Sequence, residues 1–171
     1  MESKIIFIFL DIDGVLNNEN YIIKCYKKHG KPMHMNYVPF DPKCLNELML
    51  LVQEIEANNY KVKIILSSTW RLHKVDYEIV NARLAEYGLH LTDKTPYISN
   101  DRGTEIQEFL KNKTYTDILI LDDDKFDIIN KFPTKLINTK FQTGFTKKHR
   151  LQCLDLILGK DRKQWEPKIY N

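Results

Sequence analysis

The feature that most limits how this chain can fold is a short apolar run at residues 4–10, with the sequence KIIFIFL. A continuous run of β-branched, aromatic and leucine side chains is typical of a strand buried on both faces, as in a parallel sheet. Residues 61–66, 117–121 and 135–137 are similar in character, and residues 89–91 are a candidate for a further strand. A mainly parallel sheet is therefore expected.

Segments with the helical spacing of apolar residues alternate with these strands. Asp41 and Pro42 are suited to begin one helix, because aspartate caps helix N-termini and proline is favoured in the first turn. Four more helices are predicted at residues 75–87, 104–110, 125–131 and 147–158, the last of them between Thr146 and Gly159. Alternating strands and helices predict a Rossmann-like three-layer α/β/α sandwich, with helices on both faces of the sheet.

The length and composition fit a single domain in an intracellular compartment. A chain of 171 residues is long enough to bury one core. No apolar stretch approaches the roughly 20 residues that cross a bilayer, and the N-terminal apolar run lacks the cleavage site of a signal peptide. Three cysteines without CxxC spacing indicate neither a disulfide framework nor a zinc site. We therefore expect a cytoplasmic protein that does not associate with a membrane.

Polar side chains follow three of the predicted strands at the point where each strand ends. They are Asp11 and Asp13 after the first strand, Ser67, Ser68 and Arg71 after the second, and Asp122 and Asp123 after the strand at 117–121. Ligands of a parallel sheet bind outside the carboxyl ends of its strands. We therefore expect these groups to meet at one edge of the sheet.

The acidic residues in this set point to magnesium chemistry. Clustered carboxylates repel one another unless they share a cation, and oxygen donors without histidine or cysteine favour Mg²⁺ over Zn²⁺. Asp11 could then be both a metal ligand and an in-line nucleophile that forms an aspartyl-phosphate intermediate. Asp13, two residues on, points to the same side of an extended chain and could protonate the leaving oxygen and later activate water. Gly14 lets the backbone turn sharply and approach the phosphate.

The transferred phosphoryl group also needs hydrogen-bond donors and a cation. Ser67 is expected to supply its hydroxyl and its backbone N–H. Arg102 is the candidate cation, with Lys94 and Lys111 as alternatives.

Four further residues have a structural interpretation beside a functional one. Ser68 could contact substrate or cap the end of the strand, and Arg71 could contact phosphate or pair with a carboxylate. Trp70 and Tyr37 could stack on a base or simply pack in the protein.

These residues carry a resemblance to a known family. The segment DIDGVLN at residues 11–17 resembles the first motif of the haloacid dehalogenase (HAD) superfamily of phosphohydrolases, and Ser67, Arg102 and Asp122–Asp123 with Asp127 resemble its other three motifs. More narrowly, the chain is similar over residues 4–158 to the HAD domain of "Swiss Army Knife" RNA-repair proteins. The similar stretches are FDP at 40–42, LSSTWR at 66–71, TP at 95–96, RGTEI at 102–106, LDDD at 121–124 and GFT at 144–146.

The resemblance implies a HAD-type fold without a separate cap domain, in which residues 1–171 form one domain. Residues 17–40 form a long connection without strong periodicity, too long for a plain loop, and are expected to be a basic, flap-like insertion with a function. It also implies Mg²⁺ bound by Asp11, by the Asp13 backbone carbonyl and by Asp123, with Asp122 as a neighbouring or alternative ligand. The third motif of the family is usually lysine, so Arg102 departs from the pattern. Family members without a cap tend to act on large substrates.

The charge distribution bears on the substrate. The net charge is +3, but residues 20–40 carry +4 and residues 140–171 carry +5, which leaves an acidic remainder of −6. This pattern suits a metal site that serves an anionic substrate, although lysines are also common on solvated surfaces.

Three functions therefore stay open at this point. The first is a magnesium-dependent phosphatase acting on RNA or DNA ends. The second is a phosphatase of free nucleotides or other small phosphomonoesters. The third is a non-catalytic phosphoacceptor module. The oligomeric state is left open.

Overall fold

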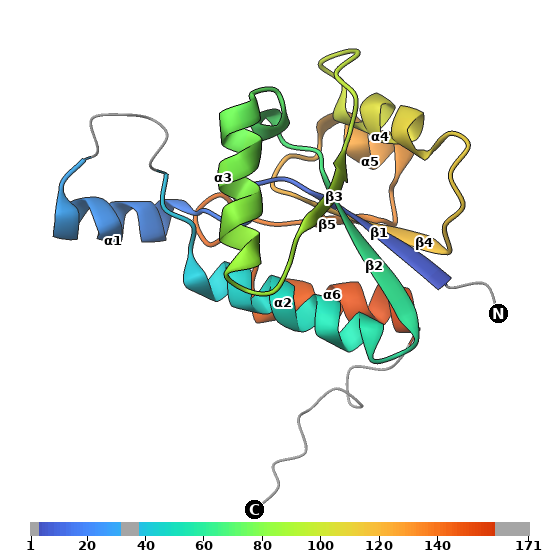
Figure 1. Ribbon diagram of the computed structural model, residues 1–171, viewed down its shortest axis with the longest axis horizontal. Coiled ribbons are helices and arrows are strands. Elements are labelled where there is room, and N and C mark those ends of the chain that lie inside the picture. The colour runs from blue at the N-terminus through green and yellow to red at the C-terminus, as the bar shows by residue number, and fades with distance from the viewer. Residues whose placement is uncertain (1–3, 32–37, 160–171) are drawn as a thin grey trace, which may run out of the picture.

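The computed structural model describes residues 4–31 and 38–159, and its centre is a five-stranded parallel sheet (Figure 1). The strands are β1 Lys4–Leu10, β2 Tyr60–Leu66, β3 Leu91–Lys94, β4 Asp117–Asp122 and β5 Leu136–Asn138. Their order across the sheet is β3-β2-β1-β4-β5, and every neighbouring pair is parallel. The predicted parallel sheet is therefore confirmed.

Helices cover both faces of this sheet. These are α2 Pro42–Glu56, α3 Lys74–Ala85, α4 Arg102–Leu110, α5 Phe126–Lys131 and α6 Lys147–Leu158; the described chain also has a protruding helix, α1 Glu19–His29, and a 3₁₀ turn η2 at Thr69–Arg71. Successive side chains of β1 point to opposite faces. Ile8 packs in a core with α2, α3 and α6, whereas Phe9 packs against α4 and α5. The three-layer α/β/α sandwich is confirmed.

Most helix ends agree with the predicted capping residues. Asp41 accepts a hydrogen bond of 2.9 Å from the Lys43 N–H and begins α2, and Gly159 ends α6 in a left-handed conformation. The structure differs at α4, which begins at Arg102 instead of 104 because Asp101 caps it through the Thr104 N–H at 2.8 Å. The candidate strand at 89–91 is displaced to 91–94.

Helix α1 was not predicted. Residues 17–40 were interpreted as a connection without periodicity, but residues 19–29 form a helix that protrudes from the rest of the protein (Figure 1). Asn18 caps it by accepting the Tyr21 N–H at 2.9 Å. Its apolar residues recur every three or four positions over only eleven residues, between lysines, and none of them is fully buried. Tyr37 lies outside the described residues.

The strand order creates a switch point in the middle of the sheet. From β1 the chain builds outward through β2 to β3, then returns to place β4 and β5 on the other side of β1. Ligands of such sheets bind in the crevice at the carboxyl ends of the two strands where the direction reverses. Asp11 and Asp122 stand at those two strand ends.

Among the described residues, no helix is both long and apolar enough to cross a membrane.

The core predicts a contrast between two leucine truncations. Leu48 in α2 is fully buried, whereas Leu156 in α6 is 39% exposed. We expect Leu48→Ala to lower the free energy of unfolding by about 3 kcal/mol, because it leaves a cavity as well as losing apolar burial. Leu156→Ala should cost less than about 1 kcal/mol. Urea denaturation measures both, and equal losses would contradict the described packing of α2.

Candidate active site

Asp11 extends the pairing of β1 by one residue and is almost completely buried. Its backbone N–H donates to the Leu121 carbonyl at 3.0 Å, and the residue is 5% exposed. Burial and the negative charge of Asp122 raise the pKa of Asp11 to about 7, against the opposing attraction of Arg102. A carboxylate in this position is costly to ionise unless more positive charge is brought to it.

Asp11, Asp122 and Asp123 form a group of three carboxylates whose donor oxygens all lie within 4.8 Å of one another. Asp122 is completely buried, and burial raises the pKa of both Asp122 and Asp123. The donors are hard oxygens, which suits Mg²⁺ better than Zn²⁺. Of the predicted metal ligands, the structure thus brings these three side chains together and leaves the Asp13 side chain outside the group.

Arg102 supplies the positive charge next to this group. Its Nη1 lies 3.1 Å from Asp11 Oδ1 and forms a second ion pair with Asp122 Oδ2. Burial would lower the pKa of Arg102, but Asp11 and Asp122 hold it above its ordinary value. Arg102 was expected just ahead of a helix, but it is the first residue of α4, so its position is set by the helix itself.

The two alternative cations lie elsewhere. The Lys94 ammonium donates to the Arg71 carbonyl at 3.1 Å, and Lys111 pairs with Glu108 on the exposed side of α4. Of the three candidates for the third motif, Arg102 is therefore the one that contacts Asp11.

Asp13 is held beside the three carboxylates by Asn17 and Trp70, neither of which was predicted to contact it. Asn17 donates from Nδ2 to Asp13 Oδ1 at 2.7 Å, and the Trp70 indole donates to Asp13 Oδ2 at 3.0 Å. The Asp13 residue is exposed, whereas Asp11 is buried. Asn17 belongs to the DIDGVLN segment and could have been found there, but the contact with Trp70 joins residues 57 positions apart.

Gly14 occupies a turn that no larger residue fits. Its φ of 71° is in the left-handed region, and a Cβ at this position would lie 2.3 Å from Asp123 Oδ2. Its carbonyl accepts a hydrogen bond of 2.7 Å from the Thr139 hydroxyl, and the Thr139 N–H donates to the Asp122 carbonyl at 3.0 Å. Thr139 was not predicted, because its role depends on the pairing of β5 with β4.

The two serines after β2 have different surroundings. The Ser67 N–H donates to the Leu10 carbonyl at 3.0 Å, so the prediction that this N–H would bind phosphate is wrong. The Ser67 hydroxyl is fully buried and has no hydrogen-bond partner among the described residues. The Ser68 hydroxyl makes a hydrogen bond with Asp11 that lowers the pKa of that carboxyl. Both hydroxyls thus remain candidates for contact with a phosphoryl group.

Arg71 ties three segments together and is buried. Its guanidinium donates to the Thr95, Ser67, Ser68 and Pro96 carbonyls and, at 2.5 Å, to Glu105 Oε2. A guanidinium carries five N–H groups, and here they meet five acceptors. Of the two interpretations of Arg71, pairing with a carboxylate is confirmed, and contact with substrate is corrected because its five N–H groups are already engaged: its side chain holds the segments that follow β2 and β3 against α4. Glu105, its partner, was not assigned a role from the sequence.

Asp127, assigned by resemblance to the acidic fourth motif, does not join the three carboxylates. It lies in the first turn of α5 and accepts the backbone N–H of Gly103 in α4. A Cβ on Gly103 would lie 2.7 Å from Asp127 Oδ2, so the glycine permits this close contact. Asp127 therefore links α5 to the start of α4, the helix that presents Arg102.

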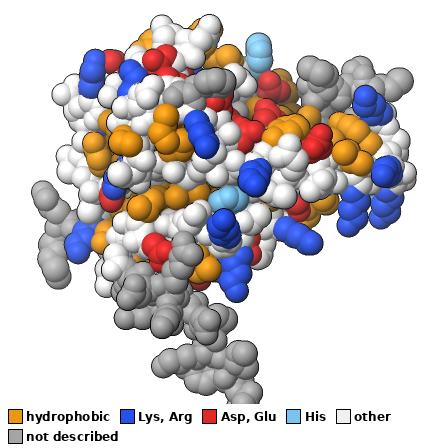
Figure 2. All heavy atoms as spheres, turned by 180° about the vertical axis from the view of Figure 1, so that it is seen from behind, with side chains coloured by type: hydrophobic (Ala, Val, Ile, Leu, Met, Phe, Trp, Pro, Cys, Tyr) orange, Lys and Arg blue, Asp and Glu red, His pale blue; other side chains and the backbone are white. Residues whose placement is uncertain are grey.

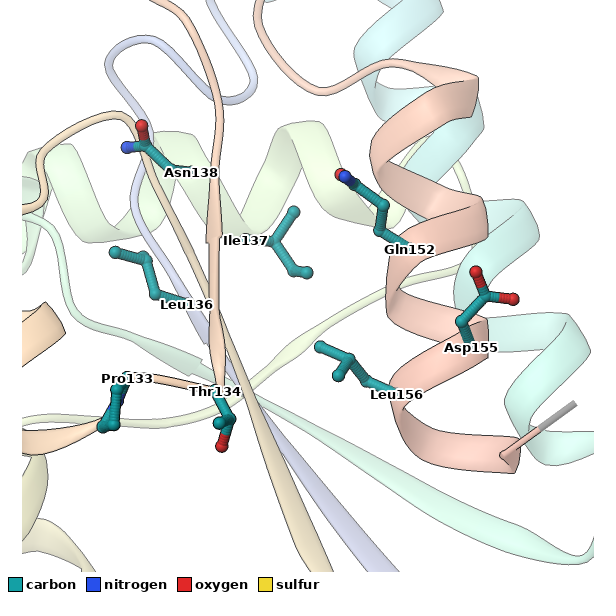
Figure 3. A pocket seen from close by; sticks show the side chains of 8 residues that line it. All are labelled: Pro133, Thr134, Leu136, Ile137, Asn138, Gln152, Asp155 and Leu156. Atoms are coloured by element: carbon teal, nitrogen blue, oxygen red, sulfur yellow. The ribbon is translucent and has the colours of Figure 1, made fainter. Parts of the chain in front are cut away.

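A hollow of about 450 Å³ between β5 and α6 is separate from this site (Figure 3). Its polar lining includes Asn138, Gln152 and Asp155, and none of the three carboxylates lines it. The chemistry of the site therefore lies at the switch point of the sheet and not in this hollow.

Comparison with known proteins identifies one family. The family model described as "HAD domain in Swiss Army Knife RNA repair proteins" matches residues 7–150. No curated protein matches the chain, and no solved structure does.

The buried pair of Arg71 and Glu105 predicts a large loss of stability when one partner is removed. Arg71→Met should lower the free energy of unfolding by about 3–5 kcal/mol, because it leaves Glu105 buried without its cation. The double variant Arg71→Met/Glu105→Met should recover part of this loss in urea denaturation. Arg83→Met is the control, since Arg83 and Glu86 are both half exposed, and it should cost less than about 1 kcal/mol. If Arg71→Met and Glu105→Met lower the free energy of unfolding additively in the double variant, the result would contradict the pairing.

The pKa of Asp11 predicts how stability depends on pH without metal. The folded protein keeps Asp11 protonated up to about pH 7, whereas the unfolded chain ionises it near 3.8. The folded state then binds more protons, so the contribution of Asp11 to stability falls as pH rises from about 4 to about 7. Relative to Asp11→Asn, the wild type should lose up to about 4 kcal/mol over this range. Urea denaturation in EDTA at several pH values measures it, and parallel curves would contradict the prediction.

Proposed function

We propose, from the premise that this chain belongs to the family of HAD domains found in Swiss Army Knife RNA repair proteins, that it hydrolyses phosphomonoesters with Mg²⁺ through an aspartyl phosphate on Asp11. Family membership points to phosphohydrolase activity in general. The finer proposal rests on one observation: Asp11 lies at the end of β1, grouped with Asp122 and Asp123 and in contact with Arg102. The proposed substrates are the terminal phosphates of nucleic acids.

The donors present fit a magnesium ion. Asp11 and Asp123 would bind it through carboxylate oxygens, and the Asp13 backbone carbonyl would add a neutral oxygen. Asp122 Oδ2 pairs with Arg102, and Asp122 Oδ1 accepts the Asp124 N–H. Because both of its oxygens already have partners, Asp122 is better placed to hold Arg102 beside the ion than to bind the ion alone. When bound, the ion would offset the negative charge of the nucleophile and of the phosphate.

In the first half of the reaction, a carboxylate oxygen of Asp11 attacks phosphorus in line with the ester oxygen. A bond from Asp11 to phosphorus forms as the bond from phosphorus to the ester oxygen breaks, and the leaving alcohol takes a proton from the Asp13 carboxyl. Arg102, 3.1 Å from Asp11, offsets the charge that spreads over the phosphoryl oxygens. The Ser67 and Ser68 hydroxyls are the donors at hand for those oxygens.

In the second half, water attacks the phosphorus of the aspartyl phosphate. Asp13, now a carboxylate, takes a proton from the water, and the bond to Asp11 breaks to release inorganic phosphate. Asn17 and Trp70 hold the two Asp13 oxygens at 2.7 and 3.0 Å, which keeps this group positioned while exposed to solvent.

Two observations favour nucleic-acid ends over the alternatives. The segments at 20–40 and 140–171 are strongly basic, which suits a polyanion better than a small phosphomonoester. The acidic nucleophile motif follows β1 while the other acids follow β4. A phosphoacceptor of the response-regulator type would instead place its acceptor on the third strand.

The proposal predicts the fate of three variants with 3′- and 5′-phosphorylated oligonucleotides in single-turnover assays. Asp11→Asn should abolish magnesium-dependent phosphate release, since it removes the nucleophile. Arg102→Ala should slow release by about 10²- to 10³-fold, and Arg102→Lys should retain more activity because it keeps the charge. Asp117→Asn is the matched control, because Asp117 pairs with Lys135 at the amino end of β4, and its rate should stay within about twofold of wild type.

Other outcomes would select an alternative. A phospho-Asp11 adduct that persists for minutes would contradict hydrolysis and favour a phosphoacceptor. A small phosphomonoester whose kcat/KM greatly exceeds that of every oligonucleotide would keep the mechanism and contradict the nucleic-acid substrate.

A further inference from the structure

Two segments that are far apart in the sequence are joined next to the acidic group. The Glu19 N–H at the start of α1 donates to the Phe141 carbonyl at 3.0 Å, and the Phe145 N–H donates to the Val15 carbonyl at 2.8 Å. These backbone bonds connect the base of α1 to the loop between β5 and α6. The two segments are therefore parts of one surface.

This loop begins at the candidate active site. Thr139 donates from its N–H to the Asp122 carbonyl at 3.0 Å and from its hydroxyl to the Gly14 carbonyl at 2.7 Å. Lys140 and Phe141 follow at once along the chain, and both are exposed. The surface formed by the loop and α1 thus starts one residue after Thr139, which is hydrogen-bonded to both Gly14 and Asp122.

The exposed side chains of this surface are basic. It carries Lys24, Lys27 and Lys28 on α1 and Lys140 and Lys148 from the loop to the first turn of α6. None of the five forms an ion pair with any residue of the described chain, whereas Lys111, Lys131 and Lys135 elsewhere each pair with a carboxylate. Figure 2 shows Lys and Arg side chains gathered on the protruding arm and again on the neighbouring part of the body, with acidic side chains between.

Lys140 in the loop and Lys148 in the first turn of α6 both act on His149. Burial lowers the pKa of the half-buried His149 imidazole, and the charges of Lys148 and Lys140 lower it further. Both ammonium groups therefore lie within electrostatic range of one imidazole, so the loop concentrates positive charge at one place beside the site. Lys160, Arg162, Lys163 and Lys168, which carry half of the basic side chains of residues 140–171, lie outside the described residues.

The lysines of α1 extend the basic surface away from the site, and Phe141 of the loop adds an aromatic ring on which a base can stack. Helix α1 has eleven residues, which corresponds to a length of about 16 Å. Its lysines are exposed, while Ile22, Cys25 and Tyr26 are half-buried. Phe141, next to Lys140, is 43% exposed. Exposed aromatics among basic side chains are how proteins hold single strands, by stacking bases and neutralising phosphates.

We propose that the basic strip, defined as Lys24, Lys27, Lys28, Lys140 and Lys148 with Phe141, binds the strand of a nucleic-acid substrate whose terminal phosphate enters the acidic group. This rests on the proposed function. The helix lysines, from Lys24 to Lys28, span about 6 Å of α1, and Lys140 and Lys148 lie on a separate loop and helix, so a ligand with several phosphates is needed to contact them together. A mononucleotide would leave its one phosphate at Asp11 and most of the strip without a partner.

Binding of fluorescent single-stranded RNA and DNA with terminal phosphates tests the strip without catalysis, in the Asp11→Asn background. Lys24→Gln/Lys28→Gln and Lys140→Gln/Lys148→Gln should each weaken binding about tenfold near 0.1 M salt. Each double variant should also reduce the slope of log Kd against log salt concentration by about 1.4, because each lost phosphate contact with a single strand reduces this slope by about 0.7. Lys4→Gln/Lys61→Gln, at the amino ends of β1 and β2, is the matched control and should leave Kd within about twofold.

Phe141→Ala tests stacking. It should weaken oligonucleotide binding by about 5-fold or more without changing the salt dependence, because a stacked ring contributes no charge. Unchanged affinity in this variant and in both lysine variants would overturn the proposal. So would tighter binding to vesicles containing phosphatidylserine than to either oligonucleotide, because the strip would then be a membrane surface.

Kinetics in the active protein separate this proposal from the proposed function. The strip variants should lower kcat/KM for phosphorylated oligonucleotides about tenfold and leave that for p-nitrophenyl phosphate unchanged. Equal losses on both substrates would overturn the strip. If the wild type releases phosphate from no substrate, the proposed function fails, and the binding measurements with their salt dependence still decide the strip alone.

Discussion

The electrostatic balance between three crowded carboxylates and one guanidinium is the constraint on which the rest of this structure depends. Asp11 and Asp122 are buried at adjacent strand ends, where mutual repulsion and loss of water oppose their charge. Arg102 pairs with both. Arg102 is the first residue of α4. Asp101 caps this helix, and Asp127 accepts the N–H of its second residue, Gly103, so both residues also position Arg102 and set the balance of charge in the site.

Backbone carbonyls rather than apolar contacts fix the loops around these charges. Arg71 gathers four carbonyls from the segments after β2 and β3, and Thr139 joins Gly14 to Asp122. Such bonds hold short loops at a definite distance from the strands that they follow, and a site built this way loses little order when a ligand arrives. The arm α1 is the contrast, since it has no buried residue and leaves its lysines available to a partner.

Sequence reasoning succeeded where the signal is local. The apolar run of β1, the Asp41 cap of α2 and the Thr146 and Gly159 limits of α6 depend on neighbouring residues, and the structure has them as predicted. It failed where partners are distant. Neither the five hydrogen bonds of Arg71 nor the bond from Trp70 to Asp13 can be inferred from spacing, because these contacts form only after β2 pairs with β1 and β3 pairs with β2.

The sequence by itself determined the fold class, the strand ends that bear the acids, and the residue types that favour magnesium and phosphate chemistry. It did so because buried strands and strand-end motifs are written in consecutive residues. The tertiary structure decided which cation faces Asp11, that Ser67 has its hydroxyl but not its N–H free, and that α1 meets the loop after β5. The physical reason is that strand order places residues over a hundred positions apart within one hydrogen bond of each other, as Gly14 and Thr139 are.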